Sequence, residues 1–76
     1  MKEETMPLIT VKVFKDELSQ EQSKALIEKI TNTVLGVTSE KLRDATWVVI
    51  EEVRDGHWGV GGNPLRLDDV KTLIAS

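Results

Sequence analysis

Residues 45–53 read ATWVVIEEV, and this stretch decides the fold class of the chain. β-Branched and aromatic residues dominate it, which is typical of a β-strand. Its centre, Trp47 to Ile50, is apolar on both of the faces that a strand presents. Such a strand needs cover on both sides, so we expect it to lie between two layers.

A second strand is predicted earlier in the chain, at residues 7–14, which read PLITVKVF. Its residues alternate, and one face carries only apolar, β-branched side chains: Ile9, Val11 and Val13. The opposite face is mixed, with Leu8, Thr10 and Lys12. The pattern therefore indicates a strand with one strongly apolar face.

The segment between these strands predicts a helix. Ser19 followed by Gln22 is the pattern of a capping box, which marks a helix start. Gly36 is expected to end the helix. One stripe at helical spacing comprises Ser23, Leu26, Ile27, Ile30 and Val34. Two strands joined through a helix should be parallel, with a right-handed crossover.

A single helix covers only one side of a two-stranded sheet. The chain has 76 residues and no cysteine, so it is one small domain without disulfide support. We therefore expect the uncovered side of Trp47–Ile50 to meet another subunit.

The C-terminal third predicts a hairpin and a short helix. Residues 54–65, RDGHWGVGGNPL, hold an Asp-Gly pair and three further glycines, which favours tight turns. Residues 67–76, LDDVKTLIAS, fit a short amphipathic helix. Residues 1–6 are interpreted as a leader, and residues 7–76 as a single α/β (α+β) domain: a β-α-β unit with parallel strands and a C-terminal hairpin.

Composition excludes several function classes. The net charge is -3, from 10 basic and 13 acidic residues without a basic stripe, so no nucleic-acid partner is expected. No apolar run is long enough to cross a bilayer, and the N-terminus lacks the apolar core of a secretory signal. The absence of cysteine fits a cytoplasmic location. One histidine cannot hold a metal alone, and we expect neither metal nor cofactor.

The segment around His57 has two interpretations. Its glycines lack the Lys-Ser/Thr ending of a phosphate loop, so turn geometry explains them better. A surface or capping role is favoured for His57, because no carboxylate or nucleophile partner is recognisable. Packing is favoured for Trp47, in mid-strand. For Trp58, pocket lining and a subunit contact are equally compatible with the sequence.

Met6-Pro7 also has two interpretations. Proline is permitted at the first residue of a strand, where it loses no ladder hydrogen bond. As a chain terminus, however, Pro7 would be a secondary amine, and α-amino groups have pKa values of about 7.7–8.0. Burial or a nearby cation would lower that pKa and give a base suited to proton abstraction beside a carbonyl.

Four segments together resemble the 4-oxalocrotonate tautomerase family: PLITVKVF, SQEQSKALIEKITNTV, TWVVIEEV and GHWGVGG. The resemblance covers residues 7–62, in the expected order. It implies a homohexamer built as a trimer of dimers, without a cofactor. It also implies an isomerase that moves a proton between carbons of an enol or dienol acid, such as a 2-hydroxy-dienoate. Its general base would be an N-terminal proline, exposed by removal of the initiator methionine.

Carried onto this sequence, the resemblance assigns four site residues. The catalytic base falls on Pro7, and the family's pocket aromatic falls on Trp58. Phe14 and Val60 would add apolar lining to the substrate pocket.

Two departures from the family pattern concern the substrate and the base. The family's two arginines, which bind substrate carboxylates, are absent: the first region reads KDELSQ and the second position holds Trp47. A dicarboxylate substrate is therefore disfavoured. Candidate replacements, in this or a neighbouring subunit, are Lys12, Lys15, Arg43, Arg54 and Arg66.

The second departure is the leader, since residues 1–6 would make Pro7 an internal amide. We favour translation from Met6, followed by removal of that methionine. The alternative is a non-catalytic subunit, which could pair with an arginine-bearing homologue in a mixed oligomer. A small-molecule-binding module without chemistry is a third, weaker interpretation.

Overall fold

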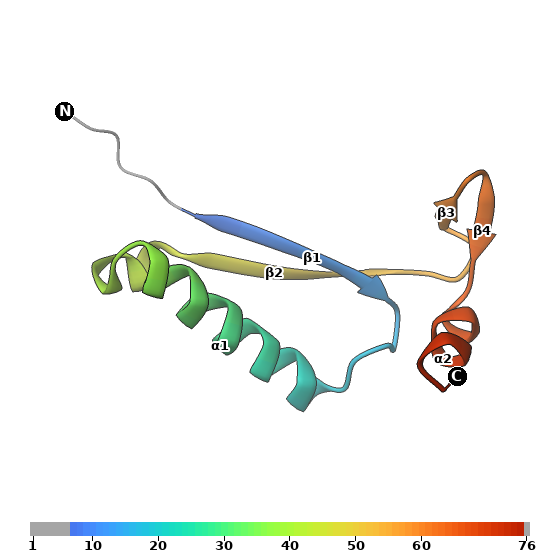
Figure 1. Ribbon diagram of the computed structural model, residues 1–76, viewed down its shortest axis with the longest axis horizontal. Coiled ribbons are helices and arrows are strands. Elements are labelled where there is room, and N and C mark those ends of the chain that lie inside the picture. The colour runs from blue at the N-terminus through green and yellow to red at the C-terminus, as the bar shows by residue number, and fades with distance from the viewer. Residues whose placement is uncertain (1–6, 76) are drawn as a thin grey trace.

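The computed structural model describes residues 7–75, so the expected leader at residues 1–6 lies outside the described residues. Two parallel strands, β1 (Leu8–Phe14) and β2 (Trp47–Val53), form one sheet. Their register runs from Leu8 opposite Trp47 to Phe14 opposite Val53. Helix α1 (Gln20–Val37) and a 3-10 helix, η1 (Glu40–Ala45), connect them. The predicted β-α-β arrangement is confirmed (Figure 1).

Helix α1 begins where the sequence indicates and ends later than expected. The Ser19 hydroxyl accepts from the Gln22 amide at 3.0 Å, and the Gln22 side chain accepts from the Ser19 amide at 2.9 Å, so the capping box is confirmed. The prediction that Gly36 ends the helix was wrong. Thr38 is the C-cap, and both its amide and its hydroxyl donate to the Val34 carbonyl, at 2.9 and 2.8 Å.

Helix α1 packs against β2 and leaves the opposite sheet face open (Figure 1). The predicted alternation in β1 is confirmed over residues 8–13, because Ile9, Val11 and Val13 are partly covered while Leu8, Thr10 and Lys12 are exposed. On the open face, Leu8 is 62% exposed and Trp47 is 58% exposed. Within the predicted α1 stripe, Ile27 is exposed.

The apolar core of one chain is small. Phe14 and Leu35 are the only buried hydrophobic residues within the described part of the chain. A domain with so little buried apolar surface gains little stability from its own core, because that stability scales with the apolar area removed from water. The open sheet face is therefore where further burial would add most.

The predicted hairpin and final helix are both confirmed. Strands β3 (Trp58–Val60) and β4 (Asn63–Leu65) pair antiparallel, and α2 spans Leu67–Ala75. Gly61 and Gly62 form the two-residue loop with φ angles of 61° and 86°, which a type I′ turn requires. In Figure 1, this hairpin and α2 lie beyond the carboxyl ends of β1 and β2, opposite the N-terminal end of the sheet.

None of the helices in the described residues has the length and apolar content needed to span a membrane.

Candidate active site

Pro7 lies directly before β1, at the N-terminal end of the sheet. Its carbonyl oxygen accepts a hydrogen bond from the Trp47 amide at 2.8 Å, which places Pro7 beside the start of β2. Its ring is half-buried. Its position before the strand costs no ladder hydrogen bond, as expected for proline there.

Phe14 and Trp58 come together at the opposite end of the sheet. Their rings are stacked, with centroids 4.9 Å apart and planes inclined by 22°. Phe14 is 3% exposed, whereas Trp58 is half-buried. Val60 lies two residues after Trp58 on β3, hence on the same strand face, and is exposed. Three of the four candidate site residues therefore belong to one end of the sheet.

Pro7 is far from that aromatic pair within one chain. Phe14 lies seven positions after Pro7 along extended strand, and at about 3.3 Å per position the distance is about 23 Å. No small enol acid can contact both ends at once. A pocket that combines Pro7 with Phe14, Trp58 and Val60 must therefore draw them from two copies of the chain.

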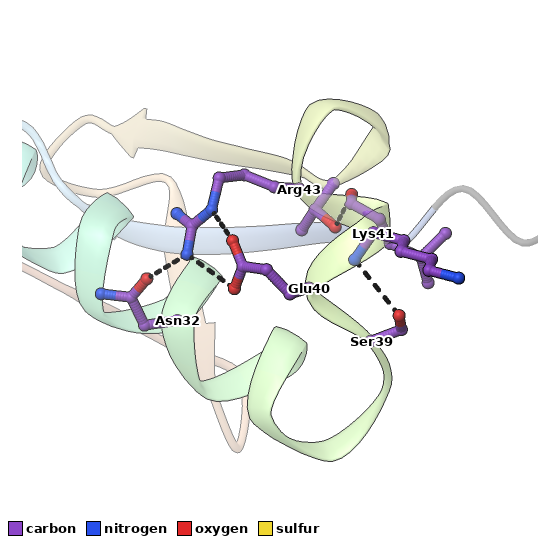
Figure 2. Close-up of polar contacts among 7 residues, drawn as sticks. Asn32, Ser39, Glu40, Lys41 and Arg43 are labelled. Carbon is purple, nitrogen blue, oxygen red and sulfur yellow. Dashed lines mark hydrogen bonds and ion pairs between the residues drawn. The ribbon is translucent and has the colours of Figure 1, made fainter.

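Three of the five candidate cations already have carboxylate partners. Lys12 pairs with Glu51, and Arg66 lies 3.8 Å from Asp55. Arg43 binds Glu40 through two hydrogen bonds and donates to the Asn32 side chain at 3.0 Å (Figure 2).

The hydrogen bond to Arg43 holds the pKa of the Glu40 carboxyl below its ordinary value, and the same bond raises the pKa of Arg43. Because its hydrogen bond to the Asn32 side chain ties η1 to α1, a structural role explains Arg43.

Lys15 and Arg54 differ from the other cations. Among residues 7–75, neither forms an ion pair with a carboxylate. They follow the last paired residues of β1 and β2, and the Lys15 amide donates to the Val53 carbonyl at 2.8 Å. Both line an open depression of about 300 Å³ at the carboxyl ends of the strands, together with Asp16, Asp55 and Leu67.

His57 contacts Arg54 rather than a carboxylate. Arg54 Nη2 lies 3.2 Å from His57 Nε2. A guanidinium can only donate, so His57 accepts through Nε2 and carries its proton on Nδ1 in this arrangement. The expected surface role for His57 fits this exposed contact.

Sequence reasoning missed the proximity of Lys15 and Arg54, because it depends on the register between two strands that are distant in sequence.

Other surface features offer less chemistry. A depression of about 530 Å³ is an open surface beside α1 whose lining residues all come from that helix: Gln20, Glu21, Ser23, Lys24, Ile27 and Glu28. Among residues 7–75, no group of three His, Asp or Glu side chains is arranged to hold a metal ion. Pro7 and the cationic strand ends are therefore the better candidates for function.

Comparison with known proteins assigns the family. The model of the family described as "Tautomerase enzyme" matches residues 7–67, so the chain belongs to the tautomerase family. The resemblance seen in the motifs is thus confirmed.

Individual relatives agree with this assignment. The chain is 42% identical over 57 residues to a probable tautomerase of Halalkalibacterium halodurans, across 75% of this chain and 90% of that protein. A solved structure from methicillin-resistant Staphylococcus aureus, described as a candidate 4-oxalocrotonate tautomerase, is 39% identical with a TM-score of 0.68, across 78% of this chain and 92% of that one. YwhB, a homologue of 4-oxalocrotonate tautomerase, is 36% identical with a TM-score of 0.68, across 83% and 97% of the two chains.

Proposed function

We propose that this protein is a tautomerase in which Pro7, as the N-terminal secondary amine, is the general base. One observation carries the proposal: the family match begins at Pro7, which lies beside an open sheet face at the start of β1. In the uncharged form, the Pro7 nitrogen takes the hydroxyl proton of an enol acid. The prolinium then donates that proton to a carbon atom of the C=C bond. The enol C–O bond becomes the C=O bond of a ketone, and Pro7 returns to its uncharged form.

The active site is shared between two copies of the chain. The span of about 23 Å along β1 supports this, since Pro7 and the Phe14–Trp58 pair cannot face one substrate within one chain. The small core of one chain, with α1 covering only one side of the sheet, supports association through the open sheet face. We propose a homo-oligomer, a hexamer by family resemblance, in the cytoplasm.

Arg54 and Lys15 of the second copy supply the positive charge. They lie at the same end as Phe14 and Trp58, and neither is neutralised by a carboxylate among residues 7–75. A guanidinium binds a carboxylate through two parallel hydrogen bonds, and a cation near the developing enolate stabilises its charge. The substrate carboxylate then stays close to the oxygen on which negative charge develops.

The first test is the intact mass of untagged protein expressed from its own gene. A mass matching residues 7–76 would leave Pro7 free to act as a base. Ketonisation of phenylenolpyruvate and 2-hydroxymuconate is then followed by absorbance, for Pro7-terminal protein and for Pro7→Ala. We expect turnover that falls about 10²–10⁴-fold in Pro7→Ala, the usual contribution of a general base.

Two outcomes would contradict the proposal. Turnover that survives Pro7→Ala would remove Pro7 as the base. Absence of turnover from correctly processed protein would favour the non-catalytic subunit, and copurification with a second tautomerase homologue would then identify its role.

A further inference from the structure

The surface that one chain presents beside Pro7 is apolar and aromatic. Leu8 and Trp47 are directly opposite each other in the register, so their side chains lie on the same sheet face. They are 62% and 58% exposed. The hydrogen bond from the Trp47 amide to the Pro7 carbonyl fixes this pair next to the proposed base.

The reacting nitrogen of Pro7 is a backbone atom, so it lies between the two faces of the sheet rather than on one of them. Neighbouring strands are about 4.8 Å apart, which is within the reach of an indole side chain. A small molecule on the open face can therefore contact the Trp47 ring while one of its atoms approaches the Pro7 nitrogen.

Charged groups on this chain do not complete a carboxylate site at the same place. Lys12 lies on the same open face, further along β1, and is paired with Glu51. Arg43 is held by Glu40 and Asn32 (Figure 2). Within the described residues, the unneutralised pair Lys15 and Arg54 lies at the far end of the strands.

We propose that Trp47, with Leu8, determines substrate specificity by binding the planar apolar substituent of a monocarboxylic enol acid, for example an aryl-substituted one. This proposal rests on the function proposed above. An indole face gains from stacking on a conjugated or aromatic group. A second carboxylate placed there would meet the negative face of the ring and would lose hydration without gaining a hydrogen bond.

The same two side chains could instead contact another copy of the chain. The two roles predict different effects of substitution. A binding surface changes the preference between substrates, whereas a subunit contact changes the native mass or affects all substrates equally. Val49 is a matched control, because it is exposed on the same face of β2 but lies two residues further from Pro7.

The kinetic experiment uses Pro7-terminal protein and compares Trp47→Ala, Trp47→Phe, Trp47→Arg and Val49→Ala. For Trp47→Ala, we expect kcat/KM for phenylenolpyruvate to fall about tenfold, the size of one aromatic stacking contact, with little change for 2-hydroxymuconate. Trp47→Phe should retain most of the activity on phenylenolpyruvate. Trp47→Arg should shift preference towards the dicarboxylate, since a guanidinium binds carboxylates.

The proposal is overturned if Trp47→Ala changes both substrates equally, if Val49→Ala has the same effect, or if Trp47→Ala lowers the native mass. Sedimentation measures that mass for each variant.

A binding experiment on the full chain separates this proposal from the proposed function. Cinnamate and trans,trans-muconate have no enol proton to transfer, so they report binding alone. The indole N–H signal of Trp47, assigned with Trp47→Phe, should shift in NMR spectra with cinnamate and shift less with muconate. If the protein turns over neither enol acid, the proposed function fails, and this signal alone decides the specificity proposal. No shift with cinnamate, or an equal shift with both acids, would overturn it.

Discussion

The two ends of the parallel strand pair differ in what they contribute. At the N-terminal end, Pro7 lies beside Leu8 and Trp47, both exposed. At the carboxyl end, Phe14 is buried against Trp58, and glycine turns support the hairpin. The N-terminal end carries a candidate base, whereas the carboxyl end carries two stacked aromatic rings and two cations. Neither end alone has the groups for the proposed reaction, so the proposal requires that copies of the chain associate.

The largest stability difference should separate Phe14 from Leu8. Phe14→Ala removes a side chain that is 3% exposed, so we expect a loss of about 3–5 kcal/mol in the free energy of unfolding. Leu8→Ala removes a side chain that is 62% exposed and should cost far less. Denaturant unfolding at matched protein concentration measures both. Equal losses would mean that Leu8 is as buried in the working assembly as Phe14.

Substitution of Arg54 tests whether the carboxyl end of the strands supplies a cation that binds the substrate. Arg54→Ala should lower kcat/KM for enol acids by about tenfold or more, since a hydrogen bond to a charged group contributes about 1.5–3 kcal/mol. Lys24→Ala, an exposed change on α1, is the control. In steady-state kinetics, most of the fall in kcat/KM of Arg54→Ala should come from a higher KM. An unchanged kcat/KM would remove Arg54 from the site.

Glycine substitutions should have smaller effects, of opposite sign in the hairpin and in α1. Gly62 has a φ of 86°, so Gly62→Ala should cost about 1–2 kcal/mol. Gly36 is inside α1 with no neighbour within 4 Å of an added methyl, so Gly36→Ala should stabilise by about 0.5–1 kcal/mol. Thermal unfolding compares the two variants. Destabilisation by Gly36→Ala would contradict the helix end at Val37.

The smallest effect concerns Glu40, and it depends on pH. Its pKa in the folded chain is below the ordinary 4.5, so its contribution to stability is present above that value and is lost as pH falls through the lower folded pKa. Because the pair is exposed, the contribution is small. Glu40→Gln should therefore differ from the parent at neutral pH and approach it in acid. A difference that persists unchanged in acid would contradict the assignment.

Local patterns predicted most of the fold. The capping box at Ser19, the alternation in β1 and the glycine loop of the hairpin all act between residues close in sequence, and each formed as expected. The end of α1 was misjudged because the helix continues through Gly36, and Thr38 closes it with two hydrogen bonds to Val34.

The candidate site was less accessible to sequence reasoning. The motifs name Pro7 and Trp58, but no local pattern reveals the strand length that keeps them apart in one chain. The position of Lys15 and Arg54 beside one depression likewise follows from the β1–β2 register, which relates residues far apart in sequence.

The most direct test of the shared active site is complementation between two defective variants. One variant is Pro7→Ala, and the other combines Trp58→Ala with Arg54→Ala. Co-expressed copies form mixed oligomers in which Pro7 of one copy meets Trp58 and Arg54 of another. We predict enol-acid turnover well above the sum of the two variants measured separately. Turnover no greater than that sum, from oligomers shown by native mass spectrometry to be mixed, would contradict a site built from two copies.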